Sequence, residues 1–259
     1  MTQVKAKKYL GQHFLRDREI AYNIASALQV DAETNVLEIG PGTGVLTQFL
    51  LSNPKINLTA VELDNESVNF LHQHYPELKV IEADFLKIDI STIFDGKFSI
   101  IGNFPYNISS QIFFKILEHK DIIPCTVCMI QKEVAERMAA RHGNKTYGIL
   151  SVLMQAFYTI DYLFTVHEHV FDPPPKVKSA VIRLTRNNVN QLGCNETLFK
   201  TVVKTAFNQR RKTMRNSLRT LMGKENAVLT QPIFDKRPEQ LDVNAFIELT
   251  NMIESACKQ

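Results

Sequence analysis

Residues 102–110 read GNFPYNISS and follow an apolar run, so Asn103, Pro105 and Tyr106 come where a strand should end. If the Asn103 side-chain oxygen and the Phe104 carbonyl accept the two N–H bonds of an adenine amino group, the nitrogen lone pair turns toward an electrophilic methyl group. Pro105 would fix the loop, and Tyr106 would offer a ring on which the base stacks. The segment predicts methyl transfer without a strong base. The alternative is a turn with a packed tyrosine.

A second segment, VLEIGPGTG, joins an apolar strand candidate to a glycine-rich turn. Gly40, Gly42 and Gly44 would let the backbone turn sharply and let a ligand approach closely. The dinucleotide fingerprint requires a glycine at the position that Val45 holds, which disfavours a nicotinamide oxidoreductase. The spacing favours a nucleoside-bearing ligand without a phosphate at the turn, and S-adenosylmethionine is such a ligand.

Acidic residues end the next two strand candidates. Glu62 comes about twenty residues after Gly42, where a carboxylate can accept hydrogen bonds from both ribose hydroxyls. Asp84, in VIEADF, could accept a hydrogen bond from an adenine amino group. Either acid alone could cap a helix, but acids at the ends of successive strands favour a ligand site. We expect S-adenosylmethionine along this edge of the sheet and no metal.

A base taken out of its helix or loop is usually held on both faces. Phe171, at the head of FDPPPKV, is the candidate for the second face, and the three prolines after it would stiffen the loop. Lys176 and Lys178 could meet phosphates. The alternative for Phe171 is a buried aromatic side chain at a strand edge, and the sequence leaves this open.

The elements that must position these residues alternate along the first two-thirds of the chain. Strand candidates begin near residues 35, 57, 78, 97, 125, 156 and 179, and helical patterns such as 65–74 and 110–119 lie between them. This alternation predicts an α/β fold with a mostly parallel, Rossmann-like sheet and helices on both faces. The last two strand candidates lie close together, so we expect an antiparallel edge.

The pattern changes after residue 186. Apolar residues then recur at near-helical spacing with basic residues between them, which predicts one amphipathic helix through Val203, Phe207, Met214, Leu218 and Leu221. We expect a cofactor-binding domain over 1–185, with a basic N-terminal segment, and a small helical domain over 186–259.

Positive charge is concentrated in this last part of the chain. The net charge is +3, but residues from 186 onward hold 12 Lys and Arg against 7 Asp and Glu. Residues 204–224 contain no acid, and a second basic cluster lies at the N-terminus. Such clustering favours a polyanion such as RNA, although a solvated helix face is the alternative. The candidate contacts are Lys5, Lys7, Lys8, Arg210, Arg211, Lys212 and Arg215.

Other classes of protein fit less well. No apolar run is long enough for a membrane span, and the N-terminal residues lack the apolar stretch of a secretory signal, so we expect a cytoplasmic protein. The CxxC formed by Cys125 and Cys128 has no second cysteine pair, and it lies in a strand candidate rather than before a helix. A structural role is therefore favoured over a zinc or redox site.

Six motifs in order resemble the small-subunit ribosomal RNA adenine dimethyltransferases, the kasugamycin-sensitivity family. They are YLGQHFL, EIGPGTGVLT, VELD, NFPYNIS, FDPPPKVKSAVIRL and FNQRRKTMRNSL. The resemblance implies transfer of four methyl groups, two to N6 of each of two adjacent adenosines in the 3′-terminal hairpin of 16S ribosomal RNA, with a late role in small-subunit assembly. It also implies cofactor contacts from His13, Leu15, Gly40, Glu62, Asp84 and Asn103.

Two positions depart from the family pattern, since His13 replaces the usual Asn and Phe104 replaces Leu or Ile. Rival interpretations are an erythromycin-resistance methylase of 23S ribosomal RNA, a DNA adenine methylase and a non-catalytic assembly factor. The FDPPPKV and RRKTMRNSL segments resemble the small-subunit family more closely than the first rival. No separate target-recognition domain supports the second, and the complete Asn103 to Tyr106 motif disfavours the third.

Overall fold

The computed structural model describes residues 4–222 and 227–257, so Lys224 of the basic segment lies outside the described residues. Contacts divide the chain into two compact units. The first comprises Met1–Ala135 and Thr159–Arg186, and the second comprises Glu136–Tyr158 and Asn187–Gln259. This division differs from the expected 1–185 and 186–259 domains in residues 136–158, which group with the C-terminal residues, and in Arg186, which belongs to the first unit.

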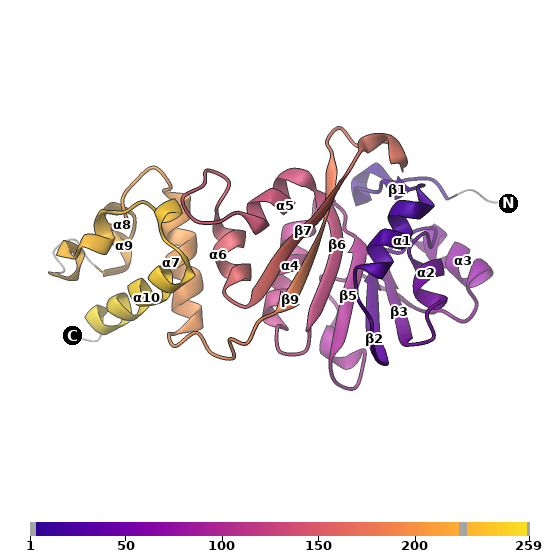
Figure 1. The fold of residues 1–259 in the computed structure, drawn as a ribbon, viewed down its shortest axis with the longest axis horizontal. Coiled ribbons are helices and arrows are strands. Elements are labelled where there is room, and N and C mark those ends of the chain that lie inside the picture. The colour runs from indigo at the N-terminus through magenta and orange to yellow at the C-terminus, as the bar shows by residue number, and fades with distance from the viewer. Residues whose placement is uncertain (1–3, 223–226, 258–259) are drawn as a thin grey trace. The chain divides into compact units, whose positions relative to one another are not determined.

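A seven-stranded sheet organises the first unit, in the order β4-β3-β2-β5-β6-β9-β7 (Figure 1). Its strands are β2 (Thr34–Ile39), β3 (Ile56–Glu62), β4 (Lys79–Glu82), β5 (Phe98–Asn103), β6 (Cys125–Gln131), β7 (Tyr158–Val166) and β9 (Ser179–Arg186). Strands β2 to β6 pair in parallel, whereas β9 pairs antiparallel with β6. The predicted α/β class, mostly parallel sheet and antiparallel edge are confirmed.

The parallel strands end together at one edge of the sheet. Ile39 pairs with Val61, and Glu62 at the end of β3 pairs with Glu82 at the end of β4. Asn103 ends β5. Ligands of open α/β sheets bind beyond the carboxyl ends of strands, because the loops that follow the strands converge there. The predicted residues after four strands are thereby gathered at one place.

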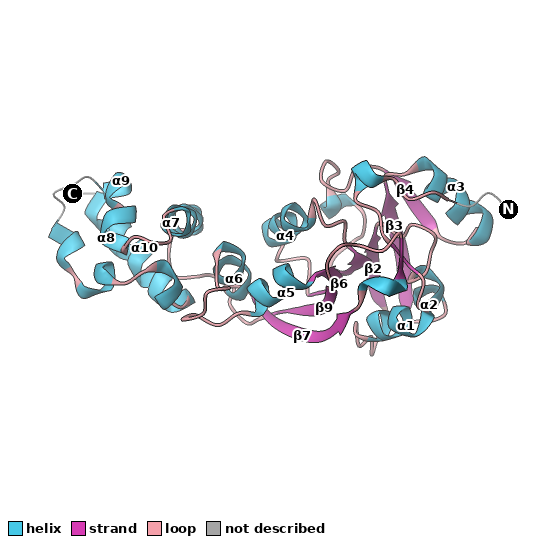
Figure 2. Ribbon diagram, turned by 90° about the horizontal axis from the view of Figure 1, so that it is seen from above, coloured by secondary structure: helices cyan, strands magenta, loops and turns pink. Residues whose placement is uncertain are grey.

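Helices cover both faces of this sheet, with α1 and α2 on one face and α4 on the other (Figure 2). The helices are α1 (Arg18–Ser26), α2 (Thr47–Leu51), α3 (Asn65–His74), α4 (Ser109–Glu118) and α5 (Lys132–Ala139). Helix α1 begins where the Asp17 carboxylate accepts hydrogen bonds from the amides of Glu19 and Ile20. The two crossover helices predicted at 65–74 and 110–119 are confirmed as α3 and α4.

Two short strands join the N-terminal segment to the loop after β7. Strand β1 (Phe14–Leu15) pairs antiparallel with β8 (Phe171–Asp172). Leu15 and Phe171 are paired in this ladder, and both belong to the hydrophobic core that also holds Ile24, Leu50 and Val127. The N-terminal segment is therefore anchored beside the loop that contains the three prolines.

The CxxC cysteines lie on β6 as predicted. Both are free, and Cys128 is fully buried. Burial raises the pKa of the Cys125 thiol to about 11 and that of Cys128 well above its usual value. Both thiols therefore stay protonated and unreactive near neutral pH, which fits a structural role.

The second unit is helical. Its elements are α6 (Ile149–Gln155), α7 (Glu196–Asn208), α8 (Met214–Ser217), α9 (Arg219–Met222) and α10 (Val243–Cys257), with the short turns η4 (Ala227–Thr230), η5 (Pro232–Asp235) and η6 (Pro238–Gln240). Phe207 packs against Tyr147 and Phe246, which fixes the end of α7 within this unit. No helix among the described residues has the length and apolar content needed to cross a membrane.

The single amphipathic helix predicted through Val203 and Leu221 is wrong. Helix α7 ends at Asn208, and the backbone turns so that the Lys212 amide donates to the Gln209 carbonyl at 2.8 Å. The Met214 amide then donates to the carbonyl of Lys236, also at 2.8 Å, at the start of a separate helix. Packing against η5 thus interrupts an apolar pattern that local spacing alone would continue.

Candidate active site

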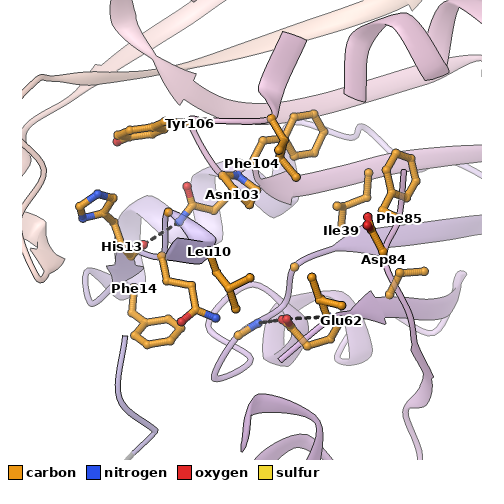
Figure 3. Close-up of a pocket in the computed structure, with 18 of the residues that line it drawn as sticks. Leu10, His13, Phe14, Ile39, Glu62, Asp84, Phe85, Asn103, Phe104 and Tyr106 are labelled. Atoms are coloured by element: carbon orange, nitrogen blue, oxygen red, sulfur yellow. Dashed lines mark hydrogen bonds between the residues drawn. The ribbon is translucent and has the colours of Figure 1, made fainter. Parts of the chain in front are cut away.

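A pocket lies at the carboxyl edge of the parallel strands (Figure 3). Clefts at this edge of an α/β sheet are the usual place for a small-molecule site. One wall is the N-terminal segment 10–14, and the others are the residues that follow strand ends. Among the latter are Gly40, Gly42, Glu62, Asp84, Asn103, Phe104, Pro105 and Tyr106. The structure therefore brings together most of the residues that the sequence singled out.

The glycine turn after β2 has one open and one crowded position. Gly40 has φ +65°, and a Cβ built there would meet nothing within 4 Å, so its backbone faces open space in the pocket. At Gly42, with φ +56°, a Cβ would lie 2.8 Å from the Phe14 ring. Gly40 thus leaves room for a ligand, whereas Gly42 lets the N-terminal segment close against the turn.

The Glu62 carboxylate holds this turn in place. Its Oε2 accepts a hydrogen bond from the Gly42 amide at 3.0 Å, and its Oε1 accepts from the amides of Leu63 and Asp64 at 2.9 Å each. Burial raises the pKa of Glu62, although the three backbone donors oppose that rise. Because a carboxylate offers about four lone-pair directions, three are already used. One ribose hydroxyl, rather than two, fits the remaining direction.

A second buried acid lies beneath the turn. Glu38 accepts a hydrogen bond from the Thr47 hydroxyl at 2.7 Å and is almost fully buried. Burial raises the pKa of Glu38 to about 8, the Thr47 bond lowers it in part, and the charge of Glu62 adds to the rise. Glu38 is therefore mostly protonated at neutral pH. The sequence contained no signal for this state.

Asp84 lies in a tight turn after β4. Its Oδ1 accepts a hydrogen bond from the Leu86 amide at 3.0 Å, and its Oδ2 lies 3.4 Å from the Lys87 amine. The half-buried carboxylate lines the pocket beside Phe85. A carboxylate held in this way can accept a hydrogen bond from a nucleobase amine, as the sequence predicted.

Asn103 is oriented by the N-terminal segment. Its Nδ2 donates a hydrogen bond of 2.9 Å to the backbone carbonyl of His13. Since a carbonyl only accepts, the amide nitrogen must lie on that side, which leaves the Asn103 oxygen to serve as an acceptor in the pocket (Figure 3). The Phe104 ring is buried 5.9 Å from Phe113, and its amide donates to Met129 at 3.0 Å. The Phe104 side chain is therefore packed in the core.

Tyr106 is held on its edge and on one face. Its hydroxyl hydrogen bonds with the hydroxyl of Ser179 on β9, and the His13 ring stacks on it with centroids 5.4 Å apart. Burial raises the pKa of Tyr106. His13 Nδ1 lies 2.7 Å from the Pro173 carbonyl and must therefore carry its proton. These contacts join the N-terminal segment, the Asn103 loop and the proline loop around the mouth of the pocket.

Ion pairs also join the N-terminal segment to the residues that follow β3. Lys7 forms an ion pair with Asp64 and a second one, at 3.3 Å, with Glu66. The hydrogen bond to Asp64 is the main cause of the raised pKa of Lys7. Lys7 is therefore engaged within the protein, which corrects its assignment to the polyanion-binding cluster. Lys5 and Lys8 are exposed.

Two of the predicted catalytic and cofactor-binding residues do not line the pocket. Leu15 and Phe171 are each 3 % exposed and pack in the hydrophobic core. Alternate side chains of a strand point to opposite faces, so Phe14 faces Gly42 while Leu15 faces away. Only the Leu15 backbone could contact a cofactor, and Phe171 would have to leave the core to meet a base. The placement of Phe171 matches its alternative interpretation.

The predicted RNA contacts divide into exposed and engaged residues. Lys176, Lys178, Arg211 and Lys212 are exposed. Arg210 instead donates to the Asn144 carbonyl at 3.3 Å and lies 4.0 Å from Glu239. Arg215 donates to the Leu229 carbonyl at 3.0 Å and pairs with Asp235 at 2.7 Å. Arg215 therefore stabilises its own unit.

Sequence patterns missed part of the pocket wall. Leu10, Gln12, Phe14, Leu63, Phe85 and Ile108 also line it. Each lies within a quoted motif or beside a predicted residue, so proximity in the sequence was the available signal. Within residues 4–222 and 227–257, no group of three His, Cys, Asp or Glu side chains is arranged to hold a metal ion.

Comparisons with known proteins show the family of the chain. A family model described as ribosomal RNA adenine dimethylase matches residues 3–253. The chain is 63% identical over 252 residues to a ribosomal RNA small subunit methyltransferase A of Parabacteroides distasonis, covering 96% of this chain and 94% of that protein. It is 60% identical over 261 residues to a protein of the same name from Phocaeicola vulgatus, covering 100% and 93%.

Solved structures resemble this one over nearly the whole chain. A dimethyladenosine transferase from Plasmodium falciparum has a TM-score of 0.81 at 28% identity, covering 94% of this chain and 98% of that one. The 23S rRNA methyltransferase ErmE has a TM-score of 0.68 at 25% identity, covering 92% and 99%. The resemblance inferred from six motifs is confirmed, and this chain belongs to the ribosomal RNA adenine dimethylase family.

Proposed function

We propose that this protein transfers methyl groups from S-adenosylmethionine to N6 of two adjacent adenosines in the 3′-terminal hairpin of 16S ribosomal RNA. Its substrate is the small ribosomal subunit or a precursor of it, and it acts late in assembly. The observation that carries the proposal is the hydrogen bond from Asn103 to the His13 carbonyl. That bond leaves an amide oxygen directed at the position of an incoming amine.

The pocket residues fit S-adenosylmethionine. Gly40 leaves the backbone open to a ligand, Glu62 retains one acceptor direction for a ribose hydroxyl, and Asp84 provides an acceptor for the adenine amine. The Gly42 amide is used by Glu62 rather than offered to a phosphate, which favours a ligand without pyrophosphate. When bound, S-adenosylmethionine supplies an electrophilic methyl group.

The protein's own contribution to the reaction is orientation. The Asn103 oxygen and the Phe104 carbonyl accept the two N–H bonds of the adenine amine, and Tyr106 supports the ring. These two hydrogen bonds draw the amine hydrogens out of the plane of the adenine ring. The nitrogen lone pair is then less delocalised into the ring and is directed at the methyl group. Once methylated, the amine is acidic enough to lose its proton without a strong base. The monomethylated product then re-enters for a second transfer.

The RNA meets exposed cations on both units. Lys176 and Lys178 extend from the proline loop, and Arg211 and Lys212 lie in the turn between α7 and α8. At the N-terminus, Tyr9 is 75 % exposed and directly precedes Leu10 of the pocket wall. Lys5 and Lys8 are exposed in the same segment. Basic residues with an interleaved aromatic ring suit a single-stranded or unpaired RNA segment, because the ring can stack on a base.

Methylation of 23S ribosomal RNA is the second candidate, favoured by the similarity to ErmE over nearly the whole chain. The experiment that separates the two is incubation of the protein with labelled S-adenosylmethionine and either unmethylated small subunits or large subunits. Nuclease digestion and mass spectrometry then locate dimethyladenosine. We expect label on two adjacent adenosines of 16S ribosomal RNA. Label on large-subunit RNA would select the rival, and label on neither, despite binding to subunits, would indicate a non-catalytic assembly factor.

A further inference from the structure

One lysine forms hydrogen bonds with the turn that carries Asp84, at the end of the pocket that would hold the cofactor's nucleobase. Lys115, on α4, donates hydrogen bonds from its Nζ to the backbone carbonyl of Phe85 at 2.6 Å and to that of Ile88. The same nitrogen lies 5.1 Å from the centre of the Phe85 ring. One ammonium group thus fixes both the backbone and the ring of the turn that carries Asp84.

Hydrogen bonds within the turn also hold it. The Ile88 amide donates to the Asp84 carbonyl at 3.3 Å, and the Leu86 amide donates to the Asp84 side chain. Phe85 and Asp84 both line the pocket, and the Phe85 side chain is buried. Lys115 contacts the turn from outside it, through α4. A shift of Lys115 would therefore move the residues that face the nucleobase.

The helix that carries Lys115 begins beside the reacting residues. Helix α4 starts at Ser109, whose hydroxyl donates to the Tyr106 carbonyl at 3.3 Å. Lys115 lies six residues later on the same helix. The lysine thus connects the loop that holds the target amine to the turn that holds the other end of the pocket.

The ammonium group of Lys115 lies in a partly buried place, where a charged group needs polar partners. Lys115 is half-buried, and burial lowers its pKa, whereas the nearby charges of Asp84, Asp89 and Glu118 oppose that change. A cation is stable in such a place only where polar partners replace water, and here those partners are carbonyls of the Asp84 turn. The turn and the lysine therefore hold each other in one geometry.

We propose that Lys115 is a positioning residue that sets Asp84 for recognition of the cofactor's adenine amino group, and that it thereby contributes to selectivity for adenine. This rests on the proposed function, since it takes the pocket to hold an adenosyl group. Lys115 does not touch the ligand itself. Its effect is expected on the discrimination between nucleobases rather than on affinity in general.

Calorimetry with two ligands tests this role. The probes are S-adenosylhomocysteine and its analogue in which the purine lacks the 6-amino group. In the unmodified protein, S-adenosylhomocysteine should bind more tightly, because only it can donate to Asp84. In Lys115→Met, we expect its affinity to fall about tenfold, the scale of one charge-assisted hydrogen bond. The analogue's affinity should change little, so the ratio approaches one. Lys115→Arg, which keeps the charge and the donors, should restore most of the ratio.

Gln111→Met is the matched control. Gln111 is exposed on α4, four residues before Lys115, and is not among the residues that line the pocket. It should keep the wild-type ratio. An unchanged ratio in Lys115→Met, an equal loss for both ligands, or the same loss in Gln111→Met would each overturn the role of Lys115. If the unmodified protein binds neither ligand, the proposed function itself fails, which is a different result.

Discussion

Asn103 Nδ2 and the backbone carbonyl of His13 are joined by a 2.9 Å hydrogen bond across 90 residues of sequence. The contact makes the N-terminal segment part of the catalytic geometry, because it decides which end of the amide faces the pocket. It also uses the backbone of His13, so it does not depend on the side chain at this position. The His13 ring stacks on Tyr106 and hydrogen bonds with the Pro173 carbonyl.

Removal of the Glu62 carboxylate should weaken cofactor binding twice over. Glu62→Ala deletes a ribose acceptor and releases three backbone amides, including that of Gly42. A lost hydrogen bond to a charged group corresponds to about 1.5–3 kcal/mol, so we expect the dissociation constant for S-adenosylmethionine to rise roughly 10- to 100-fold in calorimetry. Glu82→Gln is the control, since Glu82 is the exposed partner of Glu62 on β4. Equal affinities for Glu62→Ala and the unmodified protein would remove Glu62 from the site.

Glu38 should make the protein less stable as pH rises. Its pKa is about 8 in the folded state against 4.5 for the ordinary group, so the folded state binds more protons than the unfolded state between these values. The free energy of unfolding therefore falls with rising pH across this window, by up to about 1.4 kcal/mol per pH unit. Glu38→Gln keeps an acceptor for Thr47 but cannot ionise, so its slope should be smaller. Urea unfolding at pH 5, 6.5 and 8 measures both slopes, and identical slopes would contradict the prediction.

Arg211 and Lys212 should contribute to RNA binding through charge alone. Replacing both with Gln is expected to weaken binding to small subunits and to reduce the slope of log K against log salt by about 1 for each cation removed. Filter binding between low and moderate salt measures this slope. Arg215→Gln serves as comparison, because Arg215 is bonded to Leu229 and Asp235 and should affect stability more than the slope. An unchanged slope in the double variant would show that this turn does not face RNA.

Tyr9 should stack on an RNA base near the pocket. Base stacking on an aromatic side chain is typically about 1–3 kcal/mol, so Tyr9→Ala should raise KM for the small subunit roughly 5- to 150-fold with little change in S-adenosylmethionine affinity. Tyr9→Trp should retain binding. Tyr22, 56 % exposed on α1, offers a matched control, and Tyr22→Ala should behave as the unmodified protein. The two alanine variants behaving alike would count against a role for Tyr9.

Short sequence patterns predicted the elements that depend on residues close together in the chain. The strand ends, the glycine turn and the helices α3 and α4 follow from apolar period and turn residues, and so Gly40, Glu62, Asp84 and Asn103 were found from the sequence. Strands β1 and β8 have two residues each, too few to show a period. The faces of Leu15 and Phe171 therefore could not be assigned.

Contacts between segments far apart in the sequence could not be predicted from local patterns. The ion pair of Lys7 with Asp64 depends on how the N-terminal segment crosses the sheet edge, and no local pattern of residues indicates that path. The end of α7 at Asn208 depends likewise on the bond between Met214 and Lys236. In both cases tertiary packing overrides what neighbouring residues would favour.

The orientation of Asn103 is tested most directly by single-turnover methyl transfer. Asn103→Ala, saturated with S-adenosylmethionine and mixed with unmethylated small subunits, should lose about 10²- to 10³-fold in rate, as expected for removal of one preorganised polar group. Its affinity for S-adenosylmethionine should stay near that of the unmodified protein, which shows that the pocket is intact. Asn103→Asp, which cannot donate to the His13 carbonyl, should be similarly slow. A wild-type rate of dimethyladenosine formation in Asn103→Ala would contradict the mechanism.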